Sequence, residues 1–401
     1  METEAGQAKS LIADSAFVFF EPIKILNPDR RIQKHLVVGR PLLGAEMKKT
    51  VYPWLDLLKL IMAISVVAVH ANPLYGIDVP LASRALNVLE SVSVPFFFTA
   101  SSFLCFRGIR AEQFRERVSA GSCRVRSTIS KFVWLYCVWF LAYIPFDCLG
   151  YWLDGTSLFR AVLLELRGFF LLGEGRLSWP LWYLLASVVG FILVYAMLRK
   201  GMSARSILGA SFLFLLGGLG LSLLLTWEGA PRVIYLPVKI YSSTFGNARN
   251  GLFEGFFYIA LGMYFGMNLE SIQNIDVNKI VAAIATGVLG CFFISNDQHL
   301  LFCALVAGGI VLLAIGGGCR SDSQIFPLMR KSSTVIYLTH MMFIALYVFG
   351  ICGSRQSDVT SNSDVNHLAL FCFTVVASLL TSAGVIALSK RSSVIKKVFA
   401  V

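Results

Sequence analysis

A series of ten long apolar segments constrains the fold of this chain more than any other feature of the sequence. The segments are predicted at residues 55–74, 87–106, 130–149, 181–198, 206–227, 251–269, 279–296, 299–317, 333–352 and 367–389. Most have roughly 17 to 23 residues, which lets a helix cross a hydrocarbon core about 30 Å thick. They lack the alternation of apolar and polar residues that membrane β-barrel strands show. The sequence therefore predicts an all-α polytopic membrane protein, a bundle of about ten transmembrane helices.

The composition favours a lipid bilayer as the surroundings of the chain. Of its 401 residues, 56% are hydrophobic and 14% are charged, against about 25% charged residues in soluble domains. The net charge of +12 comes from residues between the apolar segments, and no nucleic-acid-binding motif accompanies it. We therefore expect no nucleic acid partner. The nine cysteines form no CxxC pair and have no metal-ligand spacing with histidine, so we expect no metal.

Basic residues alternate between the loops and so predict the topology. One set of loops and tails carries Arg107, Arg110, Arg115, Arg117, Arg124, Arg126, Lys131, Arg199, Lys200, Arg205, Arg320, Arg330, Lys331, Lys390, Arg391, Lys396 and Lys397. Because basic loops stay in the cytoplasm, this side is predicted to be cytoplasmic. An even number of spans then places both termini there, in a bacterial-type inner (plasma) membrane.

The predicted spans divide the chain into three parts. Residues 1–50 have a short apolar stretch preceded by acids and no small-residue cleavage site, so we expect a cytoplasmic N-terminal extension and not a signal peptide. Residues 51–392 form the expected transmembrane domain. Residues 393–401 are expected to be a short cytoplasmic tail.

His70 is an ionisable residue near the far end of the first apolar segment, and such residues are candidate functional sites. Lys59 precedes it by eleven residues, or about three helical turns, so both share one helix face about 16 Å apart. In a second interpretation, His70 is a satisfied interfacial histidine and Lys59 an anchor that extends to the headgroups.

Further candidate residues follow along the chain. They are Ser101 in an aromatic run, Trp182 and Tyr183 at the start of the fourth span, Arg249 and Glu254 at the start of the sixth, and His340 in the ninth. Each also has a structural interpretation: small residues let helices approach, aromatic residues form interfacial belts, and an acid inside a span is paired.

In their order and spacing these motifs resemble acyltransferase family 3, membrane proteins that O-acylate cell-surface and secreted carbohydrates. The resemblance covers about residues 50–390. It rests on Lys59 with His70, on Phe97-Phe98-Thr99-Ala100-Ser101-Ser102-Phe103, on Trp182-Tyr183-Leu184, and on Tyr337-Leu338-Thr339-His340. The chain departs from the family pattern at Lys59, where the family has Arg, and at Ser102, where Gly is usual. Lysine keeps the charge but lacks the planar fork of arginine.

The resemblance implies transfer of an acyl group, expected to be acetyl from cytoplasmic acetyl-CoA, to a carbohydrate or glycolipid hydroxyl at the outer face. His70 is the expected general base, because imidazole titrates near neutral pH. His340 is expected to orient the donor or the reacting carbonyl, or to pair with a neighbouring helix. The donor phosphates are expected on Lys59, Arg124, Arg126 and Lys131. The acceptor is expected near Ser101, Trp182, Tyr183, Arg249 and Glu254.

Two other functions compete with acyl transfer. A transporter or flippase of lipid-linked glycans would share the basic inner face, but it should show internal repeats and broken spans, which the sequence does not show clearly. A catalytically inactive sensor of the same fold is the other alternative, and Lys59 and Ser102 favour it. The sequence does not indicate an oligomeric state.

Overall fold

The computed structural model describes residues 52–114, 119–227, 229, 231–294, 300–317 and 323–400. The account below concerns the compact unit Val51–Val401. The predicted N-terminal extension, residues 1–50, lies outside the described residues. So do the predicted cytoplasmic loop residues Arg115, Arg117 and Arg320.

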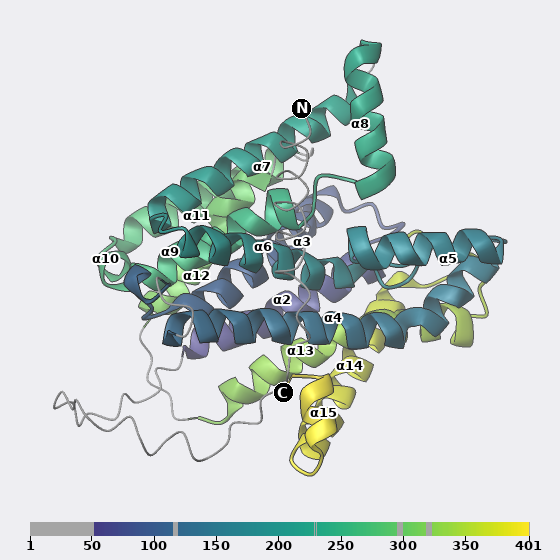
Figure 1. The fold of residues 1–401 in the computed structure, drawn as a ribbon. Coiled ribbons are helices and arrows are strands. Elements are labelled where there is room, and N and C mark those ends of the chain that lie inside the picture. Colours follow the sequence, from purple (N-terminus) through teal and green to yellow (C-terminus); the bar gives the residue numbers. More distant parts are fainter. Residues whose placement is uncertain are drawn as a thin grey trace, which may run out of the picture. The chain divides into compact units, whose positions relative to one another are not determined.

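The regular structure of the described residues is helical throughout (Figure 1). The longer helices are α2 (Pro53–Ala71), α3 (Pro80–Phe106), α4 (Ala120–Leu153), α6 (Trp182–Arg199), α7 (Ala204–Thr226), α9 (Phe256–Met267), α11 (Val277–Phe293), α12 (Leu300–Gly316), α13 (Ile325–Ala345) and α14 (His367–Ser389). Shorter helices connect or extend them: η2 (Ala111–Phe114), α5 (Leu158–Arg167), η3 (Gly168–Leu172), η4 (Trp179–Leu181), α8 (Arg232–Phe245), η5 (Gly251–Gly255), α10 (Leu269–Gln273), η7 (Leu346–Ile351) and α15 (Ser393–Val398).

The apolar helices confirm the predicted fold class. Seven are long and apolar enough to span a membrane: Pro53–Ala71, Pro80–Phe106, Ala120–Leu153, Trp179–Arg199, Ala204–Thr226, Ile325–Ile351 and His367–Ser389. Three shorter apolar helices, Gly251–Met267, Val277–Phe293 and Leu301–Gly316, occupy the remaining predicted positions. The chain is an all-α, multi-pass membrane protein.

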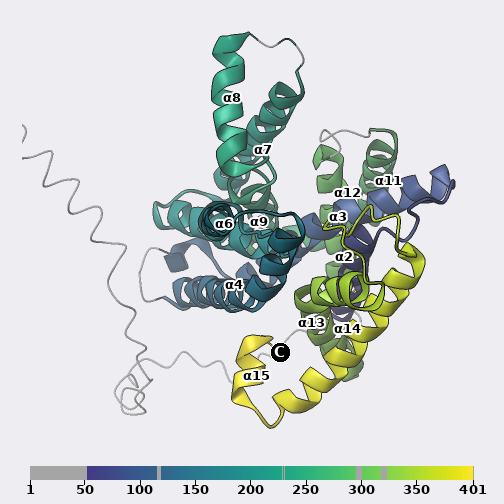
Figure 2. The ribbon, with the colours of Figure 1, turned by 90° about the vertical axis from the view of Figure 1, so that its right-hand side faces the viewer.

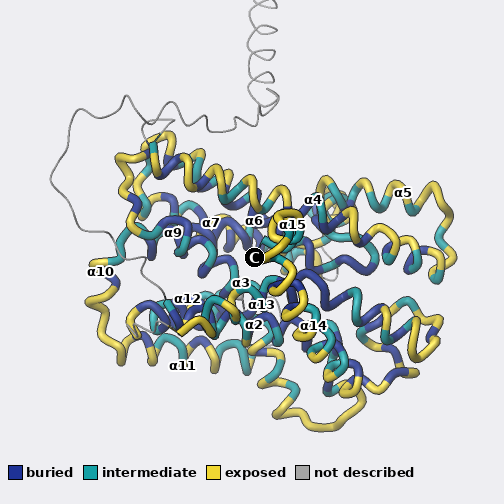
Figure 3. The backbone as a smooth tube through the Cα atoms, turned by 90° about the horizontal axis from the view of Figure 1, so that it is seen from below, coloured by how far each residue is buried: buried dark blue, intermediate teal, exposed yellow. Residues whose placement is uncertain are grey.

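Helix α2 has clear start and stop signals and lies in the centre of the unit. Pro53 begins it, where a missing N–H costs nothing, and Asn72 ends it in the left-handed conformation with its N–H bonded to the Ala68 carbonyl. The helix packs against α3, α13 and α14. Figure 2 shows α7 and α8 on the opposite side of the unit from α13 and α14. Figure 3 shows buried backbone around α2 and α13, and exposed backbone along α5 and α11.

Several helices begin earlier than the apolar segments predict. Helix α4 begins at Ala120, not at residue 130, and α13 begins at Ile325, not at residue 333. The predicted basic loop is therefore wrong in part, since Arg124 and Arg126 lie on α4 itself. The physical reason is that charged residues end an apolar segment without ending a helix, because Arg and Lys have good helix propensity.

The predicted C-terminal tail is not extended. Residues Ser393–Val398 form α15, and the indole N–H of Trp139 in α4 donates to the Val398 carbonyl at 2.9 Å. The Phe399 ring meets the Trp139 ring edge-on, with 5.1 Å between centroids. The end of the chain therefore packs on α4.

Candidate active site

Two predicted catalytic residues from distant parts of the sequence lie side by side. The imidazole centroids of His70, near the end of α2, and His340, in α13, are 5.4 Å apart. The Trp179 ring also lies beside His70, with 5.9 Å between centroids. Because α13 begins at Ile325, His340 lies past the middle of its span and not in the first half, as the predicted boundaries implied. The two histidines therefore lie at the same depth along the helix bundle.

The contacts of His340 fix which of its ring nitrogens carries the proton. Its side chain is fully buried, and Nδ1 lies 3.1 Å from the Ile336 carbonyl and 2.8 Å from the Tyr337 carbonyl. Carbonyl oxygens only accept, so Nδ1 must donate its N–H. In the neutral ring Nε2 then carries a lone pair, and this buried atom has no hydrogen-bond partner among the described residues. The neutral His340 ring can therefore accept a proton at Nε2.

An aromatic wall continues from the histidines. The Tyr337 ring lies 6.2 Å from that of His340 and 5.5 Å from that of Tyr183. The Tyr183 hydroxyl is 3.2 Å from the Ser101 hydroxyl. The structure thus links the predicted residues Ser101 and Tyr183 to the histidine pair through Tyr337, whose role the sequence analysis did not recognise.

A charged cluster surrounds Lys59, three turns before His70 on α2. Lys59 is 8% exposed, and Asp56 is 3% exposed. Arg330 Nη1 lies 3.5 Å from Asp56 Oδ2, and Arg107 and Lys131 add their charges to the surroundings of Lys59. These residues come from the start of α2, α4 and α13 and the end of α3, which is the predicted cytoplasmic end. We name Asp56, Lys59, Arg107, Lys131 and Arg330 the inner charged cluster.

Arg124 and Arg126 occupy different surroundings from Lys59. The Arg124 guanidinium donates to the Arg107 carbonyl at 3.0 Å and to the Leu104 carbonyl at 3.3 Å, and so it caps the C-terminal end of α3. Arg126 is exposed. The structure places Lys59 and Lys131 together, with Arg330 as a cation that the sequence analysis used only for topology.

Arg249 and Glu254 belong to the segment that leads into α9, and Trp182 begins α6. Arg249 is exposed, whereas Glu254 is 3% exposed in η5, which packs on α6 and α7. Trp182 contacts Phe98 and lines a mainly apolar cavity of about 290 Å³ between α6, α8, η3 and η5. Tyr241 and Asn250 supply polar groups to this cavity. Neither histidine of the pair lines this cavity.

Trp179 is a further residue of the site, and the sequence analysis did not select it. A single tryptophan before a span is typical of an interfacial aromatic belt and carries no signal of its tertiary contacts. Among the residues that the structure describes, no group of three or more His, Cys, Asp or Glu side chains could hold a metal ion.

Comparison with known families identifies the family of this chain. The model of acyltransferase family 3, described as an acyltransferase domain, matches residues 52–388. The chain belongs to this acyltransferase family. The match confirms the resemblance over nearly the predicted range, residues 50–390, and membership of the family supports a membrane acyltransferase.

Two curated relatives of this family member are named amino-acid racemase, both from Enterococcus faecalis. One is 25% identical over 220 residues, which cover 54% of this chain and 28% of the relative. The other is 29% identical over 214 residues, which cover 52% of this chain and 28% of the relative. The chain thus spans little more than a quarter of the length of either relative. No solved structure matches the chain.

Proposed function

We propose that this protein is an O-acyltransferase that moves an acetyl group from cytoplasmic acetyl-CoA to a hydroxyl of a carbohydrate or glycolipid at the outer face of the inner membrane. The observation that carries the proposal is the contact of His70 with His340, whose Nε2 is left as an acceptor. Family membership supports acyl transfer in general. The donor, the acceptor, the direction of transfer and the cytoplasmic location of both termini are part of the proposal.

The proposed reaction is direct transfer between the two substrates. The acceptor hydroxyl loses its proton to an imidazole nitrogen of the pair while its oxygen forms a bond to the thioester carbonyl carbon. The carbon–sulfur bond then breaks, and the thiolate of CoA receives the proton from the imidazolium. His340 Nε2 can take the proton in the tautomer that its contacts impose. With this tautomer, His340 Nε2 is better suited to accept a proton than to donate a hydrogen bond to the reacting carbonyl. Orienting that carbonyl was one of the roles that the sequence analysis expected for His340.

The inner charged cluster is the proposed site for the donor phosphates. Lys59, Lys131 and Arg330 gather cationic groups at one end of α2, and charge-assisted contacts to phosphate are among the stronger hydrogen bonds in proteins. Lys59 and His70 are separated by about 16 Å along α2. A donor whose phosphates and thioester stand at opposite ends of a long flexible arm suits this separation. The phosphates would remain at the cytoplasmic end, and the thioester would reach the histidines.

The acceptor is proposed to approach from the opposite end of the bundle. Trp179 is half-buried beside His70, and an aromatic ring provides a large apolar contact surface for a sugar ring. The racemase name of the relatives is not extended to this chain, because the aligned part is only 28% of each of those proteins.

The test of the proposed function uses the purified full-length protein in detergent with acetyl-CoA labelled in the acetyl group. Release of free CoA together with label on an added membrane glycan fraction is the expected result. Binding of glycan without CoA release would favour the transporter. Neither binding nor release, with intact donor recovered, would favour an inactive sensor.

A further inference from the structure

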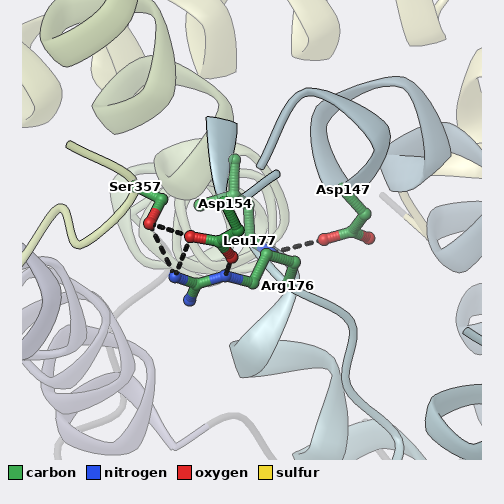
Figure 4. A network of polar contacts seen from close by, with 5 residues as sticks. All are labelled: Asp147, Asp154, Arg176, Leu177 and Ser357. Carbon is green, nitrogen blue, oxygen red and sulfur yellow. Dashed lines mark hydrogen bonds and ion pairs between the residues drawn. The ribbon is translucent and has the colours of Figure 1, made fainter. Parts of the chain in front are cut away.

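A buried carboxylate holds the turn that leads into Trp179. Asp147, in the last third of α4, is fully buried and accepts hydrogen bonds from the backbone N–H of Leu177 and, at 2.8 Å, from the Ser178 hydroxyl. The Ser178 oxygen in turn accepts from the Gly175 N–H at 2.8 Å. An acid placed deep in a bundle requires such partners. Figure 4 shows Asp147 reaching the turn from one side.

The backbone at Gly175 leaves no room for a side chain. A Cβ at Gly175 would lie 2.5 Å from Asp147 Oδ2 and 2.7 Å from Ser178 Oγ. Real side chains essentially never approach so closely, so a side chain here would displace the carboxylate or the serine. The glycine therefore allows the turn to close around Asp147.

The exposed side of the same turn carries a second anchor. Arg176 Nε lies 2.5 Å from Asp154 Oδ2, and Arg176 Nη2 donates to the Ser357 hydroxyl at 2.9 Å. Figure 4 shows Asp154 and Ser357 gathered at the Arg176 guanidinium, apart from the Asp147 carboxylate. Since an exposed ion pair contributes little and a buried hydrogen-bonded carboxylate contributes more, Asp147 is the stronger anchor.

The far end of the turn reaches the histidine pair. The Tyr337 hydroxyl donates to the Pro180 carbonyl, and Tyr337 is three residues before His340 on α13. Trp179, between Ser178 and Pro180, places its ring 5.9 Å from that of His70. The turn thus connects α4, through Asp147, to α13 and to the ring of His70.

We propose that Asp147 is a positioning residue for the histidine pair: it holds the turn 173–178 so that Trp179 covers His70 and fixes the position of its imidazole. The proposal rests on the proposed function, because it treats the pair as the reacting centre. Asp147 does not touch the substrates. It acts through Leu177, Ser178 and Trp179.

The experiment measures how fast diethyl pyrocarbonate modifies His70 in the full-length protein, by mass spectrometry of its peptide. His367, buried and bonded to the carbonyls of Ala71 and Asn362, is the internal reference for global unfolding. In Asp147→Leu, His70 should react severalfold faster relative to His367. Asp147→Asn should behave like the wild type, because an amide oxygen can still accept from the Leu177 N–H. Asp154→Asn should also be near the wild type.

Gly175→Ala and Trp179→Ala, with Gly209→Ala as a control, keep the test decisive if Asp147→Leu does not fold. Gly175→Ala should expose His70 as Asp147→Leu does, whereas Gly209→Ala should not, since no atom lies within 4 Å of the added Cβ there. Trp179→Ala should also expose His70, and adding Asp147→Leu to it should cause no further increase. Unchanged reactivity of His70 in both Asp147→Leu and Gly175→Ala, or an additive effect in the double variant, would overturn the proposal.

A parallel assay separates this proposal from the proposed function. With labelled acetyl-CoA, Asp147→Leu should lower the transfer rate at least about tenfold, because small displacements of reacting groups are costly, while the KM for acetyl-CoA stays unchanged. If no variant or wild type transfers acetyl but His70 still becomes exposed as described, the proposed function fails and the positional role of Asp147 stands. A raised KM for the donor with His70 still protected would overturn the positional role.

Discussion

His70 and His340 differ in how their surroundings hold them, although their rings are neighbours. His340 is buried, and two backbone carbonyls determine its tautomer. His70 is half-buried, and its ring lies close to the rings of both His340 and Trp179. The sequence marks both as ionisable residues within apolar segments. It cannot show that they meet, because their contact depends on the register of α2 against α13.

Lys59 provides a prediction at the scale of a single side chain. Lys59→Met should raise the apparent KM for acetyl-CoA roughly tenfold or more, the loss expected for one charge-assisted contact to phosphate. Lys59→Arg should keep the KM near the wild-type value, because it preserves the charge. Steady-state kinetics of both variants, with folding checked by size-exclusion chromatography, measures this. A wild-type KM in Lys59→Met would make Lys59 a structural partner of Asp56.

Asp154 provides a prediction about pH. Its hydrogen bond to Arg176 lowers the pKa of its carboxyl below the usual 3.8, with a smaller contribution from Ser357. The folded-state pKa is depressed, so this stabilisation is present above about pH 4 and is lost as the pH falls through the folded pKa. Because the pair is partly exposed, its contribution should stay below about 1 kcal/mol.

The measurement for Asp154 is the thermal midpoint of the wild type and Asp154→Asn between pH 6 and pH 3. The wild type should be slightly more stable at the upper end, and the two curves should converge toward the lower end. A constant difference over the whole range would show that the Asp154 charge does not contribute.

At the scale of helices, the sequence predicted which segments exist better than where they begin. All ten apolar segments correspond to helices in the structure. The amphipathic helices α5 and α8 lie outside the predicted apolar segments. In α8, Arg232, Lys239 and Pro237 interrupt the apolar pattern, and α5 has only ten residues. The π-helical segments η3, η5 and η7 were also missed, since a change in helical register depends on packing and leaves no composition signal.

The close contact of α9 with α3 at Gly262 gives a prediction at the scale of helices. A Cβ at Gly262 of α9 would lie 2.2 Å from the Thr99 carbonyl oxygen of α3, so Gly262→Ala must separate the two helices. We expect a loss of about 1 to 3 kcal/mol of stability, as for other overpacked sites. Gly220→Ala in α7, where no atom lies within 4 Å of the added Cβ, is the matched control. Equal thermal midpoints for the two variants would contradict this packing.

For the molecule as a whole, the arrangement of charge and helices predicts which end faces the cytoplasm. The inner charged cluster and the exposed Cys123 lie where α4 and α13 begin. The exposed Cys352 follows η7, at the other end of the α13 span. By the positive-inside rule, the end with the cluster is cytoplasmic. The sequence predicts this orientation directly, because it depends only on the order of spans and charges.

Labelling of these native cysteines tests the orientation. In variants that retain only Cys352 or only Cys123, a membrane-impermeant maleimide should label Cys352 in intact cells. Cys123 should be labelled only after the cells are permeabilised. The reverse pattern would place the inner charged cluster outside and would remove the proposed route for cytoplasmic acetyl-CoA.

The central claim is that His70 and His340 together perform acyl transfer, and it is tested most directly by replacing each histidine. The measurement is the rate of acetyl transfer from labelled acetyl-CoA by His70→Ala and His340→Ala, with Gly220→Ala, where no atom lies within 4 Å of the added Cβ, as the control. Each substitution in the pair should lower the rate by about 10² to 10⁴, the contribution of a general base. Transfer above about a tenth of the wild-type rate in both variants, with normal folding, would contradict the claim.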